Sequence, residues 1–92
     1  MKDSVESQWI EVFSALASEQ RLRIVEMLAD GKLECKEIIA GLGLSQPAIS
    51  YHLGKLERAG ILKKERHGTH NCYEISKRVH GLMGFMQRED RR

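Results

Sequence analysis

The segment Ser45–Leu53, SQPAISYHL, carries small polar side chains where a surface helix usually carries Lys and Glu. Gln46 and Ser50 are four residues apart, so a helix places both on one side, away from Ile49 and Leu53. A Gln amide presents a donor and an acceptor together, which matches the N6 and N7 edge of adenine, and a Ser hydroxyl suits several base edges. These residue types at this spacing predict hydrogen bonds to base pairs.

Neighbouring side chains extend this predicted contact surface. Ser45 is a good helix cap at the edge of the surface, and Ala48 suits the methyl group of a thymine. Tyr51, His52 and Lys55 are expected to reach phosphate oxygens. Two alternatives stay open: the polar residues form only a solvated surface, and His52 makes its hydrogen bond within the domain.

A second basic surface is expected where the hydrophobic period changes from 3.6 to 2, after Gly60. Ile61–Arg66 and His70–Ile75 are predicted to form a β-hairpin, joined by a turn at His67–Thr69. Five side chains on it suit phosphates or the minor groove, namely Lys63, Lys64, Arg66, His67 and His70. Edge strands also carry Lys to prevent aggregation, so a structural role for any single lysine stays open.

Helical periodicity predicts the elements that position these residues. The expected helices cover residues 4–17, 18–29, 35–42, 45–59 and 77–90, with Leu33 in a short extended link. Leu44 alone separates Gly43 from the cap Ser45, and so short a Gly-containing turn between helices is the helix-turn-helix signature. The predicted fold is therefore mostly α with a small β-hairpin (α+β), a winged helix-turn-helix with additional helices at both ends. The wing covers about 61–75.

The charge of the chain is unevenly distributed, although its net value is only +2. Residues 1–43 carry five basic and eight acidic side chains, a net of −3, whereas residues 44–80 carry a net of +4. The basic half contains both predicted contact surfaces. This asymmetry favours an anionic partner on one side of the molecule.

Length and composition limit the class of protein. Ninety-two residues are expected to form a single domain over residues 1–92. No apolar run approaches the roughly 20 residues of a membrane span, and the N-terminus lacks the layout of a secretion signal. Two cysteines are too few for a disulfide framework, so we expect a cytoplasmic protein without a membrane partner. No Gly-rich phosphate loop, nucleophile motif or carboxylate pair in an apolar context is present, which argues against an enzyme.

Residues 15–75 resemble the ArsR/SmtB family of dimeric transcriptional repressors. The run LSQPAISYHLGKLERAGIL carries the most specific part of the resemblance, and RLRIVEML supports it. The resemblance implies a homodimeric repressor that binds operator DNA. The competing interpretation is a winged-helix module for protein contacts within a larger assembly, in which the basic wing is incidental.

The first and last predicted helices have apolar faces wider than a small core can bury. The expected dimer surface consists of Trp9, Phe13, Leu16, Val79, Leu82, Met83 and Met86. Core packing within one subunit is the alternative. A two-fold dimer would place two recognition helices about 34 Å apart, one turn of DNA, which predicts an inverted-repeat operator.

The metal sites that the resemblance implies are incomplete in this sequence. The family's Cys-x-Cys pair corresponds to Glu34 and Lys36, and Cys35 between them cannot alone supply two or three soft ligands. The second site needs a pair of ligands on the last helix, which offers His80 and, about three turns later, only residues 88–91. We therefore expect no metal and no cofactor, and the sequence does not identify the effector.

The two cysteines offer a further possibility. Cys35 begins a short helix, whose dipole can lower the pKa of a thiol, and Cys72 lies on the wing beside basic residues. The alternatives are a redox switch at either thiol and a role for both as small apolar fillers. His67, His70 and Cys72 also form a compact set of three ligand types, which spacing alone neither establishes nor excludes as a zinc site.

Overall fold

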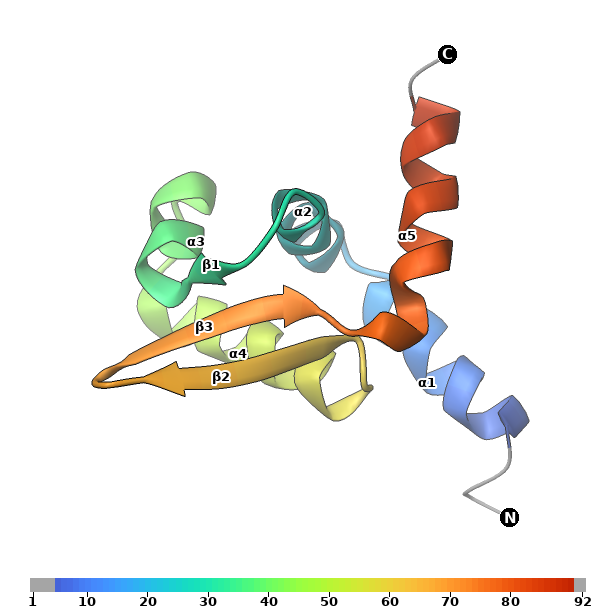
Figure 1. Ribbon diagram of the computed structural model, residues 1–92, viewed down its shortest axis with the longest axis horizontal. Coiled ribbons are helices and arrows are strands. Elements are labelled where there is room, and N and C mark those ends of the chain that lie inside the picture. The colour runs from blue at the N-terminus through green and yellow to red at the C-terminus, as the bar shows by residue number, and fades with distance from the viewer. Residues whose placement is uncertain (1–4, 91–92) are drawn as a thin grey trace.

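The computed structural model describes the backbone of residues 5–90 and the side chains of residues 5–82. Its elements, in chain order, are α1 (Val5–Leu16), α2 (Glu19–Leu28), β1 (Leu33–Glu34), α3 (Cys35–Leu42), α4 (Gln46–Arg58), β2 (Leu62–His67), β3 (His70–Ile75) and α5 (Lys77–Asp90) (Figure 1). The fold is mostly helical with a small antiparallel sheet, as the sequence predicted. Within the described residues, no helix is long and apolar enough to cross a membrane.

Local signals explain where the helix-turn-helix begins and ends. α3 ends at Gly43, whose φ of 72° lies in the left-handed region that glycine adopts without strain. α4 begins after Ser45, whose Oγ accepts a hydrogen bond from the backbone N–H of Ala48 at 3.2 Å. Such a cap contributes about 1 kcal/mol, and Pro47 in the first turn has no N–H that needs a partner. The turn between α3 and α4 is thus bounded by the left-handed Gly43 and the Ser45 cap.

The sheet contains one strand more than the sequence predicted. Its order is β1-β3-β2, and Leu33, expected in an extended link, pairs with Tyr73 across the first pair of strands. The hairpin turn is also shorter than predicted, because His67 belongs to β2 and pairs with His70. The two-residue turn between them starts with Gly68 at a φ of 65°, which fits the twist of a tight hairpin.

The core lies between the helices and one face of the sheet. Its buried side chains come from every helix and from the sheet, and they include Val12, Ile24, Leu28, Ile38, Ile49, Leu53, Leu56, Ile61, Tyr73, Ile75 and Val79. Two of the residues predicted for the dimer surface belong to this core, since Leu16 is 6% exposed and Val79 is fully buried. That prediction is wrong for both, because their own subunit covers these parts of the apolar stripes.

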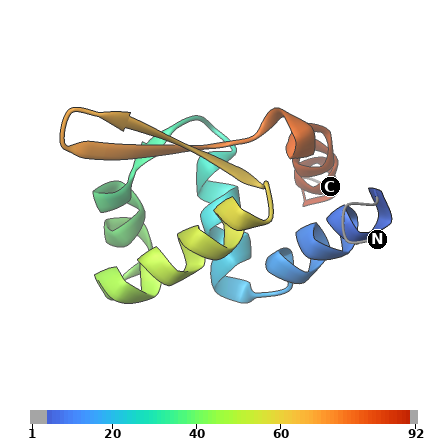
Figure 2. The same ribbon diagram turned by 90° about the horizontal axis from the view of Figure 1, so that it is seen from below.

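The surface predicted to contact DNA and the surface predicted to form the dimer lie at different ends of the molecule. Both views place α1 and α5 together at one end, and the tip of the β2–β3 hairpin projects at the other (Figures 1 and 2). The N-terminal end of α4 points toward the same end as the hairpin tip. The fold therefore groups the start of α4 with the hairpin, and α1 with α5.

Candidate nucleic-acid interface

The two flanks of α4 differ sharply in burial. Ile49 is fully buried and Leu53 is 2% exposed, whereas Gln46, Ser50 and the cap Ser45 are exposed. The buried flank holds the helix against the core, and this leaves the polar flank open to solvent over the first turns of the helix. The start of α4 is thus available to a groove of DNA, while Ala48 is half-buried beside it.

Tyr51 is the most prominent aromatic side chain on α4, with 55% of its surface exposed. The Lys55 ammonium lies 5.7 Å from the centroid of the Tyr51 ring, a distance at which the cation is attracted to the ring face. The His52 ring packs edge-on against the same phenol ring, with centroids 5.3 Å apart. The exposed side of α4 therefore carries a charged and aromatic cluster next to Gln46 and Ser50.

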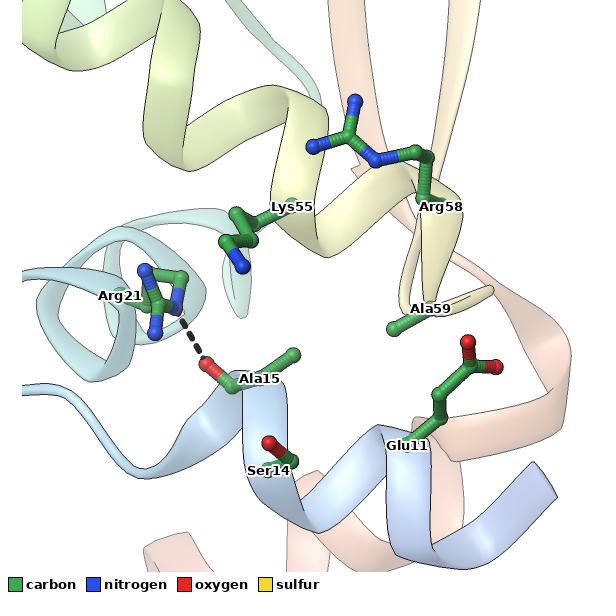
Figure 3. Close-up of a pocket in the computed structure, with 7 residues that line it drawn as sticks. All are labelled: Glu11, Ser14, Ala15, Arg21, Lys55, Arg58 and Ala59. Atoms are coloured by element: carbon green, nitrogen blue, oxygen red, sulfur yellow. Dashed lines mark hydrogen bonds between the residues drawn. The ribbon is translucent and has the colours of Figure 1, made fainter. Parts of the chain in front are cut away.

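His52 is engaged by its own chain, which favours the alternative left open for it. Arg21 Nη1 donates a hydrogen bond to His52 Nδ1 at 3.1 Å, and because Arg only donates, Nδ1 must be the acceptor. Arg21 Nε donates to the carbonyl oxygen of Ala15 at the end of α1 (Figure 3). One guanidinium thus joins α1, α2 and α4, and His52 helps to position the recognition helix.

Sequence reasoning missed Arg21. The one available signal was its place in the first turn of α2, where the helix dipole disfavours a cation. Its partners lie on other helices, and the partner on α4 is 31 residues away, so no local pattern could identify them.

Burial lowers the pKa of His52, and the positive charge of Arg21 lowers it further. The folded state therefore favours the neutral imidazole, while the unfolded chain binds a proton near the ordinary value of 6.5. The stability that this difference provides is complete above about pH 6.5. It is lost as the pH falls from there toward the lower pKa of the folded state.

We expect acidification to destabilise the wild type more than His52→Asn, whose amide oxygen can accept from Arg21 but cannot be protonated. Urea unfolding between about pH 7.5 and about pH 5 gives the free energy of unfolding of each protein. The other histidines are common to both proteins, so their contribution cancels. Parallel pH profiles would contradict this role of His52.

The basic side chains of the hairpin are exposed but not all unpaired. Lys63 and Lys64 are exposed on β2, and Lys64 Nζ lies 3.9 Å from Glu57 Oε1 on α4. Arg66 Nε donates to the carbonyl oxygen of Gly68 at 3.1 Å, which braces the turn. Exposed pairs of this kind contribute little to stability, so these cations remain available to phosphates.

The two hairpin histidines lie beside carboxylates. His67 Nε2 is 3.3 Å from Glu65 Oε1, and His70 Nδ1 is 3.9 Å from Glu34 Oε1. Glu65 also pairs with Lys32 at 3.1 Å, and these partners lower the pKa of its carboxyl group, led by the hydrogen bond from Lys32. The histidines are therefore weaker candidates for phosphate contacts than the lysines.

The cysteines lie in different surroundings. Burial raises the pKa of the Cys35 thiol, which favours the alternative of a small apolar filler over that of a thiol activated by the start of α3. Cys35 packs against the core, whereas Cys72 pairs with Glu34 and Glu65 across the sheet. Across the part of the chain with described side chains, no group of three or more His, Cys, Asp or Glu residues is arranged to hold a metal ion.

Among the residues whose side chains are described, the large exposed apolar side chains are concentrated on α1. Val5 is 69% exposed, Ile10 63% and Phe13 54%, while Trp9 is half-buried with its ring 6.0 Å from that of Phe13. A cluster of large apolar side chains exposed to water usually marks a surface that contacts another molecule. Sequence reasoning missed Val5 and Ile10, which lie beside the predicted residues on the same short helix.

The link between α1 and α5 was also not predicted. Arg78 lies with its guanidinium carbon 5.7 Å from the centroid of the Trp9 ring and donates from Nη2 to Gln8 Oε1 at 3.1 Å. Leu82 is half-buried against the core. The side chains of Met83 and Met86, predicted for the dimer surface, lie outside the described residues.

The fold and the exposed flank of α4 define a winged helix-turn-helix protein, a class that reads DNA with the second helix of the motif. A protein-family model described as "Bacterial regulatory protein, arsR family" matches residues 18–64 of the chain. The chain belongs to the ArsR family of transcriptional regulators, as the sequence indicated.

Relatives and solved structures agree with this family. The chain is 42% identical over 66 residues to the uncharacterized HTH-type transcriptional regulator MJ1325 of Methanocaldococcus jannaschii, a match that covers 71% of this chain and 74% of that protein. The structure of HlyU from Vibrio cholerae superposes with a TM-score of 0.86 at 30% identity, covering 94% of this chain and 95% of that one. The homodimeric winged helix-turn-helix DNA-binding domain of Mb0332 from Mycobacterium bovis gives the same TM-score and identity, with coverages of 94% and 81%.

Proposed function

We propose that this protein is a homodimeric repressor that reads an inverted-repeat operator on double-stranded DNA. The observation that carries the proposal is the exposed polar flank at the start of α4, which stands over a fully buried apolar flank. A helix held in this way can place its first turns in the major groove of DNA, while the preceding helix contacts the DNA backbone.

Within this arrangement the residues divide into two groups. Gln46 and Ser50 are suited to base edges, with Ala48 beside them for a thymine methyl. The phosphate contacts fall to Ser45, Tyr51, Lys55, Lys63, Lys64 and Arg66, which fix register without reading sequence. His52 acts through Arg21 rather than on DNA.

The dimer surface that we propose is the apolar face of α1 with the adjoining part of α5. Phe13 and Trp9 from the sequence prediction, together with Val5 and Ile10, supply a face too large to leave in water. The homodimeric state in the description of Mb0332 supports a homodimer for this chain as well. Two copies related by a two-fold axis would present both α4 helices to one side of a duplex.

Repression requires nothing beyond occupancy of an operator, which is why we propose it as the mode of regulation. A regulator that acts in this way works in the compartment that holds the DNA, which we propose is the cytoplasm. The raised pKa of Cys35 leaves less of the reactive thiolate, which argues against a redox switch at that thiol.

Replacing Lys64 with alanine should weaken binding to every duplex alike and flatten its dependence on salt. Each phosphate contact releases counterions, so the loss of one should reduce the slope of log K against log salt by about 1. Fluorescence anisotropy with a random-sequence duplex, at several salt concentrations, measures this slope.

Arg23→Ala is the matched control, since it removes one exposed positive charge from α2, where Arg23 pairs with Glu19. It should leave the slope unchanged. Equal slopes for the wild type and both variants would contradict a phosphate contact by the wing. A wild type that binds no duplex at low salt would refute the proposed function as a whole.

A further inference from the structure

A pocket of about 200 Å³ lies between α1, α2 and the C-terminal half of α4. Its lining residues are Glu11, Ser14, Ala15, Arg21, Lys55, Arg58 and Ala59 (Figure 3). The pocket thus joins the helix proposed for dimerisation to the helix proposed for DNA reading. The DNA-binding scheme above uses Lys55 and Arg21 but gives no role to Glu11, Ser14 or Arg58.

Positive charge predominates around this pocket. Lys55 points into it, toward Arg21, and the Glu11 carboxylate stands on the facing wall (Figure 3). Arg58 extends back along α4, where Gly54 has no side chain and the guanidinium Nη1 comes within 3.2 Å of the position that a Cβ would take. Among the described residues, no ion pair engages Lys55, Arg58 or Glu11.

Arg21 gives the pocket a fixed positive wall. Its Nε is held by the Ala15 carbonyl oxygen and its Nη1 by His52, so this guanidinium is ordered before any ligand arrives. Pre-ordered charge costs less to use in binding than a mobile side chain does. Ser14 adds a hydroxyl donor from α1, beneath Ala15 in Figure 3.

We propose that this pocket binds a phosphate group, with Lys55 and Arg58 as its cationic partners and the Ser14 hydroxyl as a hydrogen-bond donor. Arg58 reaches the group by turning from its place over Gly54 toward the pocket. Glu11 opposes the anion and so limits its affinity. The phosphate belongs either to the DNA backbone or to a free phosphate ester, since both offer the same oxygens to the same partners.

The test is a titration of the DNA-free, full-length protein with inorganic phosphate at constant ionic strength, followed by ¹⁵N–¹H NMR. We expect saturable shifts at the amides of Ser14, Arg21, Lys55 and Arg58. Arg58→Gln should weaken the affinity about tenfold, and Glu11→Gln should strengthen it about threefold, because the repelling charge is removed. Arg23→Gln is the control outside the pocket and should match the wild type.

The gain in Glu11→Gln separates a ligand site from a merely structural cluster, because loss of folding cannot raise an affinity. Each variant should first show the dispersed spectrum of the folded protein. Shifts that do not saturate, or an affinity that Arg58→Gln and Glu11→Gln leave unchanged, would overturn the proposal.

Two further arms distinguish the sources of the phosphate. If the DNA backbone supplies it, a duplex shifts the same amides, phosphate competes with DNA, and Arg58→Gln reduces the salt slope by about 1. If a free ester supplies it, phosphate still binds the DNA complex and Arg58→Gln leaves the salt slope unchanged. Either result supports a phosphate site in this pocket. The phosphate site and the proposed DNA-binding function are tested separately, because the protein can fail to bind phosphate and still bind DNA.

Discussion

Replacing Phe13 with glutamate should convert the dimer into monomers and lower the affinity for a full operator by about 100-fold or more, toward that of non-specific binding. Phe13 is 54% exposed and lies next to Trp9 and Ile10 on the face that we propose to be the interface. Two-fold symmetry brings each copy of the new carboxylate into an apolar contact, where a charge without a partner is costly. A single subunit can then hold only one half-site.

Sedimentation equilibrium gives the oligomeric state of this variant, and anisotropy with one and two half-sites gives its affinity. Ala40→Glu is the matched control, because Ala40 is exposed on α3, away from α1. It should sediment as the wild type does. A dimeric Phe13→Glu protein would exclude the α1 face as the interface.

Replacing Gln46 with alanine should cost roughly 1–3 kcal/mol on the preferred operator, which corresponds to about 5- to 150-fold in affinity. The Gln46 side chain is exposed at the start of α4, and its amide can satisfy a donor and an acceptor of one base at once. Its removal should also relax the choice of base at a single position in each half-site.

Competition between duplexes that differ at one position measures this relaxation. Lys64→Ala is the contrasting variant, since a phosphate contact is lost alike on all sequences. An equal loss on every duplex for Gln46→Ala would reassign this side chain to the backbone of DNA.

Most of the fold could be predicted because its signals are local. The caps Ser18 and Ser45, the left-handed Gly43 and the change of period after Gly60 each mark a boundary within a few residues of sequence. The two residues of β1 gave no such signal. They form a strand only because the free edge of β3 accepts them.

The division between core and dimer surface could not be read from periodicity. A helical stripe shows which residues are apolar, but not which part of it the same subunit covers. Leu16 and Val79 are covered, whereas Phe13 on the same helix as Leu16 is not. This distinction depends on how α1 and α5 pack against the body of the protein.

The candidate site was predicted in part. The exposure of Gln46 and Ser50 followed from their spacing against Ile49, whereas the engagement of His52 depended on Arg21, from a distant part of the chain. For Cys35, burial raises the pKa of the thiol, and burial is not visible in sequence.

Selection of bound sites from random DNA by the wild-type protein tests the central claim most directly. If two copies of α4 read DNA together, the selected sites should be enriched in an inverted repeat. The centres of its half-sites should lie about 10 base pairs apart, or a multiple of that spacing. A single unrepeated motif, or enrichment no greater than charge alone produces, would contradict the assignment of α4 as a paired reading helix.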